Sequence, residues 1–391
     1  MRHRKSNRIL SVLLALALLF VLTACTAKPA APEPEETVSE TAAPEPALEP
    51  APDPEPEPEP VRRNDLVGIS MPTKEIERWR RDGIDMRRQL EQLGYEVDLQ
   101  FAGNDSATQA SQIEHMIANN AKALVITLVI GGEEQYSVLE QARAAGCAVI
   151  AYDYPIAFDA VSGYVRFDNA EVGAALGRFI ADRLDLANAD DKVYNIEFVG
   201  GSPGDGESAY VFHNGYMNEL QKYIDAGTLN VVSGQVDFEA IATEGWSAAK
   251  AQERFQNILR SYYTDQPLHA VLAEWDLVAQ GVAAALESSY SNDVYPIITG
   301  QGCDLASVQN ILQGKQAMSV FLDTRDLAAK AVEMADAVMT GAELPANGQF
   351  TTVDGRFTYP VFNCEPTVCT EDNIVETMLG YGRFTAEEMG Q

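Results

Sequence analysis

The sequence has little positive charge for its length. Its 391 residues include 28 lysines and arginines against 58 aspartates and glutamates, which gives a formal net charge of −30. Proteins that bind nucleic acid need basic patches that neutralise phosphates. The acidic excess therefore argues against nucleic acid as a partner, and against a protein that lies flat on an anionic membrane.

Histidine and cysteine are also scarce. The four histidines are scattered, and the five cysteines form no CxxC pair and no His/Cys cluster with zinc spacing. We therefore predict no metal site and no cofactor. Cys364 and Cys369, in CEPTVC, are close enough in sequence for a small disulfide outside the cytoplasm. Cys147 is expected in the core, and Cys303 has no obvious partner.

Catalytic signatures are missing as well. The chain has no GxSxG elbow and no phosphate-binding P-loop, and its glycine-rich stretch VGGSPGDGES lacks the GxGxxG order. Paired acids such as Asp153 and Asp276 could serve acid–base chemistry, but no other feature supports an enzyme. We predict a protein without catalytic activity.

The chain has only one long apolar run, and it lies at the start. The cationic stretch MRHRKSNR precedes ILSVLLALALLFVL, and LTAC follows, with small residues before Cys25. This order is typical of a secretory signal peptide over residues 1–24. The cysteine resembles a bacterial lipobox, which implies lipid attachment to Cys25 and anchoring to the outer face of the cell membrane. The alternative is a single membrane span, although the run is shorter than the ~20 residues that a span needs.

Residues 25–60 lack what a folded core needs. After Cys25 they are mostly proline and acid, with almost nothing apolar to bury. Pro-rich chains extend by about 3.1 Å per residue. We therefore predict a disordered, semi-rigid linker that lifts a folded domain away from the membrane.

From residue 65 onward, apolar strands alternate with helical patterns. The stretches DLVGIS, YEVDLQFA, ALVITLVI and VIAYD read as strands, and each is followed by a helical pattern or a turn. This alternation predicts an α/β fold whose parallel sheets are covered by helices on both faces. The length suits two doubly wound lobes, and ligands bind beyond the carboxyl ends of the strands in such sheets.

Polar residues gather where these predicted strands end. VIAYDYP, residues 149–155, carries a buried strand into Asp153 between two tyrosines, and VRFDN ends on Asp168 and Asn169. The order and spacing of GISMPTKEIERW, QASQIEHMI, VIAYD, VRFDN, GGSPGD, RSYYTD, TGQ and DTRDLA resemble a known family over nearly all of residues 65–385. That family is the type I periplasmic sugar-binding proteins of ABC transporters, in its xylose-binding and multiple-monosaccharide-binding branch.

The resemblance implies two lobes joined by three hinge crossings, near Arg166–Asp168, Leu322–Thr324 and residues 345–350. The N-terminal lobe would comprise residues 65–166 and 324–345, and the C-terminal lobe residues 167–323 and 346–391. The resemblance also implies a monomer that captures a sugar or sugar-like ligand between its lobes and delivers it to ABC permease and ATPase subunits. The alternative is a sensor that presents its ligand state to a membrane receptor.

A sugar site needs a particular set of side chains. Each hydroxyl both donates and accepts, so its burial requires paired polar partners, and ionised acceptors make the stronger hydrogen bonds. Aromatic rings suit the C–H faces of the sugar. On the family pattern we expect ligand contacts from Arg78, Trp79, Asp153, Tyr154, Asp168, Asn169, Glu207, Trp246, Asp276 and Gln301.

Plain structural roles stay open for several of these residues. Arg78 could lie on a solvated helix face, and Asp153 could cap a turn. Asp168 could be the N-cap of the helix that follows it. Trp246 could be a core residue, and Trp275 could equally pack under the sheet.

Four positions depart from the family pattern. Tyr154 stands where arginine usually follows the strand-end aspartate, and Glu207 stands in a loop that usually carries asparagines. Gly302 replaces an aspartate, and Leu322 replaces a lysine. These changes predict a ligand other than a simple aldopentose: a larger, less polar or cationic one, such as an amino sugar, polyol, glycoside or nucleoside.

Overall fold

The computed structural model describes residues 64–129, 134–205 and 207–391. The predicted signal peptide (1–24), Cys25 and the linker to residue 60 lie outside the described residues. These described residues belong to one compact unit. None of the helices in the described ranges is both long and apolar enough to cross a membrane.

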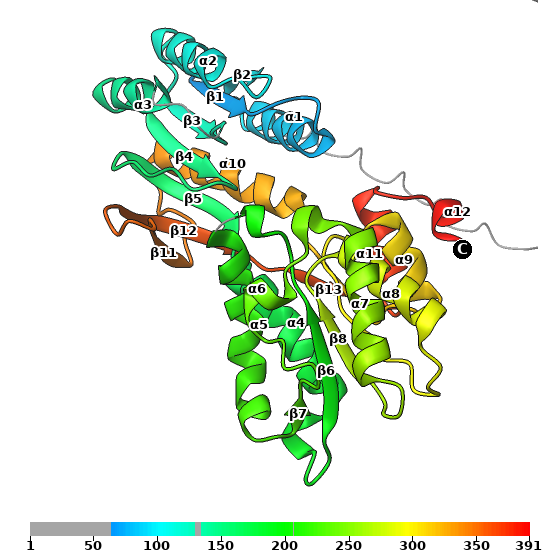
Figure 1. Cartoon of the computed structure of the whole chain (residues 1–391). Coiled ribbons are helices and arrows are strands. Elements are labelled where there is room, and N and C mark those ends of the chain that lie inside the picture. Colours follow the sequence, from blue (N-terminus) through cyan, green and yellow to red (C-terminus); the bar gives the residue numbers. More distant parts are fainter. Residues whose placement is uncertain (1–63, 130–133, 206) are drawn as a thin grey trace, which may run out of the picture. The chain divides into compact units, whose positions relative to one another are not determined.

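The first sheet has seven strands in the order β11-β12-β5-β4-β3-β1-β2 (Figure 1). Neighbouring strands are parallel except for the hairpin of β11 and β12, which is antiparallel. The strands are β1 (Leu66–Met71), β2 (Glu96–Phe101), β3 (Ala123–Ile126), β4 (Ala148–Tyr152), β5 (Val161–Phe167), β11 (Gly348–Thr351) and β12 (Thr358–Cys364).

Helices cover both faces of this sheet, as its apolar central strands require. All four residues of β3 are buried. Two helix pairs provide the cover: α1 (Glu77–Gln92) packs with α10 (Thr324–Thr340), and α2 (Ser106–Ala118) packs with α3 (Glu134–Ala144). We call the sheet and these helices the first lobe.

The second lobe is built on a four-stranded parallel sheet in the order β7-β6-β8-β9. Its strands are β6 (Tyr194–Val199), β7 (Leu229–Asn230), β8 (Ala270–Ala273) and β9 (Ile297–Ile298). A bridge from Gln301 to Val320 continues the sheet toward β10 (Ser319–Phe321), which pairs with β13 (Thr367–Cys369).

The helices of the second lobe again form packed pairs. α4 (Asn169–Arg183) packs with α5 (Glu207–Asp225), and α7 (Ala248–Tyr262) packs with α8 (Asp276–Ser289). The remaining helices are α6 (Phe238–Ile241), α9 (Leu305–Leu312), α11 (Ile374–Tyr381), α12 (Ala386–Met389) and the 3₁₀ turns η1 (Leu186–Asn188), η2 (Pro203–Asp205) and η3 (Glu244–Trp246). The predicted α/β class, with parallel sheets and alternating helices, is confirmed.

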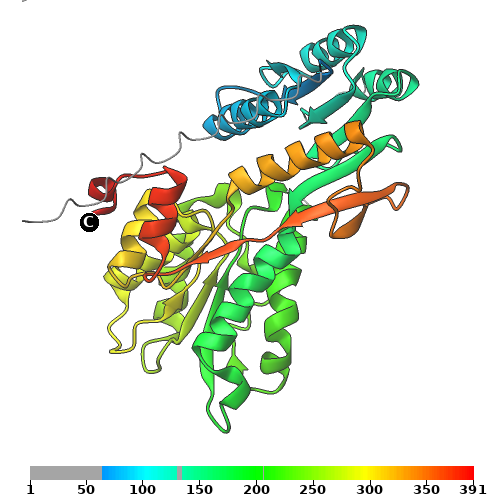
Figure 2. The same ribbon diagram turned by 180° about the vertical axis from the view of Figure 1, so that it is seen from behind.

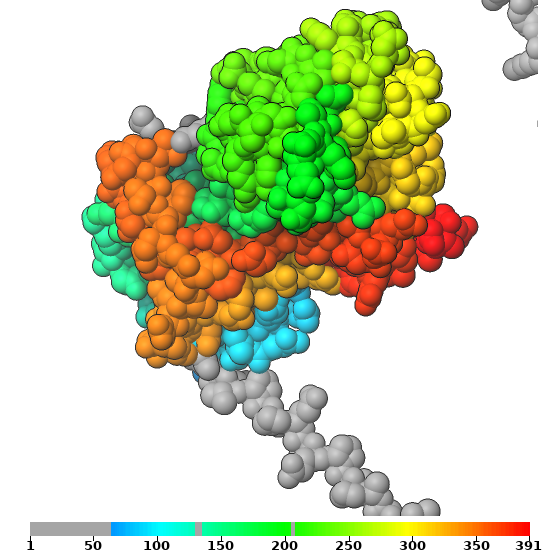
Figure 3. Space-filling model, turned by 90° about the horizontal axis from the view of Figure 1, so that it is seen from below, coloured from blue at the N-terminus to red at the C-terminus, as the bar shows by residue number. Residues whose placement is uncertain are grey.

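The third passage between the lobes lies later in the chain than predicted. We expected it near residues 345–350, which would place residues 346–391 in the C-terminal lobe. Instead β12 pairs in parallel with β5, with Val361 opposite Tyr164, so residues 348–364 belong to the first sheet. The chain then enters the second lobe between Cys364 and β13. Figure 2 shows β12 leading into this extended segment, and Figure 3 shows the C-terminal residues as a continuous orange-to-red band across one face.

Two glycines let α4 and α5 approach closely. A Cβ on Gly173 would lie 2.1 Å from the carbonyl oxygen of Phe212, and one on Gly215 would lie 2.2 Å from that of Ala170. Both obstacles are backbone atoms, which can yield only if a whole helix moves. The pair therefore depends on hydrogen at both positions.

Replacing Gly215 by alanine should destabilise the protein by about 2 kcal/mol or more, because overpacking against backbone costs ~1–3 kcal/mol. Urea unfolding of the variant measures the loss. Gly380→Ala in α11 is the matched control, since a Cβ there meets nothing within 4 Å. The control should leave stability unchanged or raise it by up to about 1 kcal/mol. Equal stabilities for the two variants would contradict this account of the helix contact.

Candidate functional site

A cavity of about 560 Å³ is lined by residues of both lobes. It lies beyond the carboxyl ends of β4 and β5 in the first sheet and of β8 in the second, where parallel α/β sheets bind ligands. Its polar and aromatic lining includes Arg78, Asp153, Tyr154, Tyr164, Arg166, Asn169, Ser208, Trp246, Glu274, Trp275, Gln301 and Phe350.

Asp153 follows directly after β4 and has an unusual backbone conformation. Its φ of 64° lies in the left-handed region, which aspartate tolerates better than most residues. Two hydrogen bonds hold it there: its N–H donates to the carbonyl of Val165 (2.8 Å), and its own carbonyl accepts from the Tyr164 hydroxyl (2.7 Å). A strained position fixed in this way is typical of functional sites.

Arg78 lies in the first turn of α1 and pairs with Asp153. One of its terminal nitrogens is 2.9 Å from the Asp153 carboxylate, and its Nε is 3.5 Å from that of Asp82. Its guanidinium also lies 4.5 Å from the centre of the Trp79 ring. The arginine therefore lines the cavity between two acids instead of extending into solvent.

Asp82 supports this arrangement from below the cavity. It is 3% exposed, and its carboxylate accepts hydrogen bonds from the hydroxyls of Tyr152 (2.9 Å) and Thr324 (2.6 Å). Burial raises its pKa. Thr324 in turn contacts the Tyr381 hydroxyl at 2.9 Å. These bonds tie α1 and β4 to the start of α10, where the chain returns to the first lobe.

The first-lobe wall also presents an aromatic residue. Tyr154 is 40% exposed and lines the cavity, and it makes an edge-to-face contact with Trp79 at 5.7 Å between ring centres. Trp79 itself is 5% exposed and does not line the cavity. The structure therefore places Trp79 behind Tyr154, as its packing support.

The opposite wall carries two tryptophans. Trp246, with φ of 55°, packs so closely on Gly201 that a Cβ there would lie 2.0 Å from the indole. Trp275 lies 5.4 Å from Trp246 between ring centres, tilted by 50°. Both rings are half-buried and line the cavity, so they offer an apolar surface to a ligand.

Six of the ten residues predicted for the site line this one cavity: Arg78, Asp153, Tyr154, Asn169, Trp246 and Gln301. Besides Trp79, the structure places Asp168 and Asp276 outside the lining. Asp168 is the N-cap of α4, accepting from the N–H of Ala170 at 3.0 Å, and it lies 3.1 Å from Arg166. The side chain of Glu207 lies outside the described residues.

Asp276 lies under the second-lobe wall and is fully buried. It accepts hydrogen bonds from the side chains of Gln316 (3.0 Å) and Ser319 (2.9 Å) and from the N–H of Asp304 (2.8 Å). Burial raises its pKa to about 6. Its own N–H donates to the Gln301 carbonyl at 3.0 Å. Asp276 thus holds the segment that carries Gln301 instead of lining the cavity.

Other residues that line the cavity were not predicted from the sequence. Glu274 comes directly after β8 and is 1% exposed, and its carboxylate accepts from the N–H of Gly201 (2.6 Å) and the Tyr216 hydroxyl (2.8 Å). Its place at a strand end was the available signal. Phe350 and Val353 come from the β11–β12 hairpin. No local sequence pattern predicts that this hairpin pairs with β5.

The side chains that line the cavity are suited to binding a polar ligand. Carboxylates, two amides and two guanidinium groups face a space that has aromatic rings on both walls. Among residues 64–129, 134–205 and 207–391, no group of three or more His, Cys, Asp or Glu side chains is placed to hold a metal ion.

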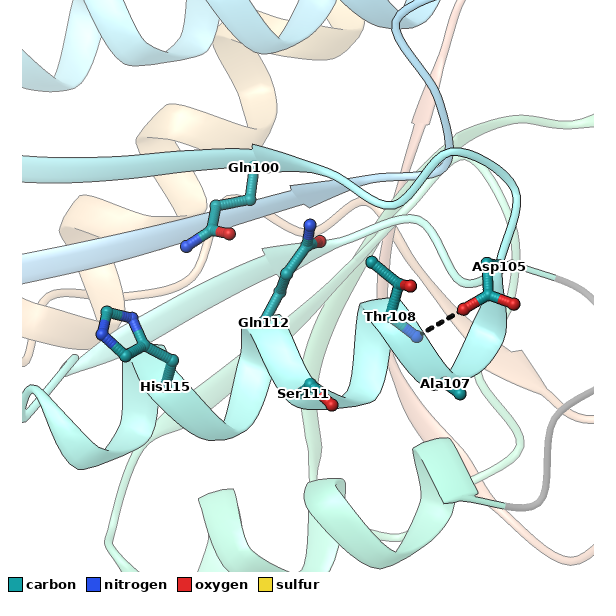
Figure 4. Close-up of a pocket in the computed structure, with 7 residues that line it drawn as sticks. All are labelled: Gln100, Asp105, Ala107, Thr108, Ser111, Gln112 and His115. Atoms are coloured by element: carbon teal, nitrogen blue, oxygen red, sulfur yellow. Dashed lines mark hydrogen bonds between the residues drawn. The ribbon is translucent and has the colours of Figure 1, made fainter.

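Another hollow lies on the first lobe alone (Figure 4). Its side chains come from β2 and α2 and from the turn before α2, where Asp105 accepts from the N–H of Thr108 as a helix cap. Its lining contains no pair of oppositely charged side chains and no residue of the second lobe. The cavity between the lobes is therefore the candidate site.

Comparisons with known proteins agree with this geometry. Residues 67–343 match the model of the periplasmic binding protein domain family. The chain is 40% identical over 323 residues to the multiple sugar-binding periplasmic protein SbpA of Azospirillum brasilense, covering 82% of this chain and 89% of that protein. It is 37% identical to the multiple sugar-binding periplasmic receptor ChvE of Rhizobium radiobacter, over 83% and 92% of the two chains.

Solved structures add a close relative. An ABC transporter solute-binding protein from Clostridium phytofermentans with bound β-D-glucose is 46% identical, with a TM-score of 0.65, and the match covers 83% of this chain and 100% of that one. A carbohydrate transporter solute-binding protein from Chloroflexus aurantiacus in complex with D-glucose is 28% identical, with a TM-score of 0.62, over 83% and 98% of the two chains. The predicted type I periplasmic binding protein fold is confirmed.

Proposed function

The chain belongs to the periplasmic binding protein family, and we propose that it captures a monosaccharide outside the cytoplasm and delivers it to an ABC transporter. Relatives at 40% and 37% identity are described as multiple sugar-binding periplasmic proteins. The function is binding and handover, with no chemical step on the ligand.

One observation carries the proposal. Asp153 and Arg78 form a fixed acceptor–donor pair on the first-lobe wall, while Trp246 and Trp275 form an aromatic surface on the second-lobe wall of the same cavity. Hydroxyls bound to the first wall leave the C–H face of a sugar free to stack on the second. Closure of the lobes on such a ligand follows the hinge motion of two-lobed binding proteins.

The ligand we propose is a neutral aldohexose pyranose of the glucose class. Among the described residues, the lining has two acids: Asp153 is paired with Arg78, and Glu274 is 1% exposed and accepts from Gly201 and Tyr216. Both acids are thus engaged within the protein, which disfavours a cationic ligand. The relative at 46% identity has β-D-glucose bound. Both points favour glucose over the amino sugar or nucleoside that the sequence departures left open. Tyr154 then serves as a hydroxyl donor and rim aromatic.

Delivery requires partners. We propose that a permease and an ATPase receive the sugar, and that lipid on Cys25 tethers the protein to the membrane while the proline- and acid-rich linker gives it reach. The acidic excess of the chain, whose net charge is −30 over all 391 residues, disfavours contact with anionic lipid.

Calorimetric titration with glucose, galactose, xylose, glucosamine, myo-inositol and adenosine tests the proposal. The protein is the chain from residue 25 onward with Cys25→Ser, which avoids the lipid. We expect saturable one-to-one binding of glucose or its epimers, and a melting temperature that rises with ligand, since a hundredfold excess over Kd adds about 2.7 kcal/mol of stability. Binding of glucosamine or adenosine alone, or of nothing in the panel, would overturn the assignment.

A further inference from the structure

Two cysteines far apart in the sequence meet inside the second lobe. Cys303 lies two residues after Gln301, and Cys369 is the last residue of β13. Both are fully buried and belong to one apolar cluster with Phe321, Ile374 and Met378. Both lie against Ser319 of β10: Cys369 is its ladder partner, and Cys303 is hydrogen-bonded to its side chain.

The fold holds this pair from both sides of β10. Across the ladder, Ser319 of β10 is the direct partner of Cys369. On the other side, the N–H of Cys303 donates to the Ser319 hydroxyl at 3.0 Å, and its sulfur lies 3.8 Å from the Ser319 carbonyl. Cys303 has φ of 51°, in the left-handed region.

The pairing that the sequence left open, Cys364 with Cys369, fits the structure less well. Cys364 ends β12 in the first sheet, and only two residues separate it from β13. A chain that runs from one strand directly into the next advances ~3.3 Å per residue, or roughly 16 Å over five residues. Disulfides need Cα atoms within about 7 Å.

We propose that Cys303 and Cys369 form a disulfide in the mature protein outside the cytoplasm. The extracytoplasmic location supplies the oxidising conditions in which structural disulfides persist. The oxidant is a small-molecule or protein disulfide. Cys369 as thiolate attacks it, forming a mixed disulfide and releasing one thiolate; the deprotonated Cys303 then attacks the Cys369 sulfur and releases the second. Two electrons and two protons pass from the cysteines to the oxidant.

The local chemistry suits this order of events. The neighbouring Cys303 thiol lowers the pKa of Cys369, which favours Cys369 as the attacking thiolate. The bond would join the segment that carries Gln301, at the cavity, to the strand by which the chain re-enters the second lobe. It would thus fix one wall of the sugar site to the C-terminal elements.

Thiol counting after export into an oxidising compartment tests the proposal. The chain from residue 25 with Cys25→Ser is denatured in excess N-ethylmaleimide, with and without prior reduction, and its mass is measured. Four cysteines remain: Cys147, Cys303, Cys364 and Cys369. We expect two adducts without reduction and four with it, and a tryptic peptide pair that joins Cys303 to Cys369.

Thermal unfolding supplies the second readout. Reduction should lower the melting temperature of the parent by about 5 °C or more, because a structural disulfide typically contributes several degrees, and should leave C303S/C369S unmoved. C147S is the matched control and should keep the full response to reduction. Four adducts without reduction, even after incubation with oxidised glutathione, would overturn the proposal, as would a bond mapped to Cys364. The adduct count needs only the parent, so the test stands if a variant fails to fold. It also needs no ligand, so it is independent of the sugar assignment.

Discussion

Replacing Asp153 by alanine is expected to weaken glucose binding at least a hundredfold. The carboxylate offers acceptors to sugar hydroxyls, and bonds to charged groups are worth about 1.5–3 kcal/mol each. The change also leaves the Arg78 guanidinium without its 2.9 Å partner in the cavity, which adds the cost of an unpaired charge. A hundredfold loss corresponds to about 2.8 kcal/mol, and calorimetric titration measures it directly.

Two further variants make the result specific. Asp153→Asn keeps the side-chain shape and the tolerance for a φ of 64°, so it separates loss of charge from backbone strain, and we expect a smaller loss of affinity. Asp159→Ala is the control, because Asp159 is exposed and pairs with Arg143 at 3.2 Å away from the cavity. If Asp153→Ala binds glucose like the parent while Asp159→Ala does the same, the cavity is not the sugar site.

Replacing Asp276 by alanine should lower the free energy of unfolding by about 3 kcal/mol or more, the largest loss among the substitutions considered. Three donors, from Gln316, Ser319 and the Asp304 backbone, would lose their acceptor in a fully buried place, and each unsatisfied buried group costs about 1–3 kcal/mol. Affinity should fall much less than in Asp153→Ala, because Asp276 does not line the cavity. Denaturant unfolding and titration of the same sample separate the two effects.

The pH dependence of Asp276 has a definite sign. Its folded-state pKa of about 6 exceeds the ordinary value of 3.8, so the native state holds a proton that the unfolded state releases. The contribution of Asp276 to the free energy of unfolding therefore falls as pH rises from about 3.8 to about 6, by about 3 kcal/mol in total. The difference in unfolding free energy between the parent and Asp276→Asn should shrink from pH 4 to pH 6.5. A difference that stays constant or grows over this range would contradict the raised pKa.

Much of the fold could be predicted from the alternation of apolar strands and helical patterns. The α/β class needs only local periodicity, and β5 gives way to α4 at Asp168, where a passage between the lobes was expected. The third passage was misplaced because Thr358–Cys364 reads as a strand whichever sheet it joins. The short strand β7 ends at Asn230, and beyond it Ser233 bonds the buried Glu197 through its N–H (3.0 Å) and its hydroxyl instead of continuing the ladder, a contact that no local pattern predicts.

Part of the candidate site could also be predicted from the pattern of apolar strands. A polar residue after a buried strand identifies the edge of the sheet where ligands bind, and this placed Asp153 and Gln301 correctly at the cavity. The pattern does not say which way a side chain faces. Glu274 and Asp276 both follow β8 in the sequence, yet only Glu274 lines the cavity, while α8 starts at Asp276 and turns it into the core.

The place of β12 beside β5 has a consequence for how the chain acquires its structure. In the finished sheet β5 is an interior strand between β4 and β12. Until residues 358–364 have been synthesised, β5 is an open edge, and open edges invite pairing with other chains. The whole second-lobe segment from Asn169 to Phe321 emerges before that edge is closed. Contacts of such long sequence separation form slowly. The first lobe therefore cannot complete itself ahead of the second, and no single cut in the chain yields two self-sufficient halves.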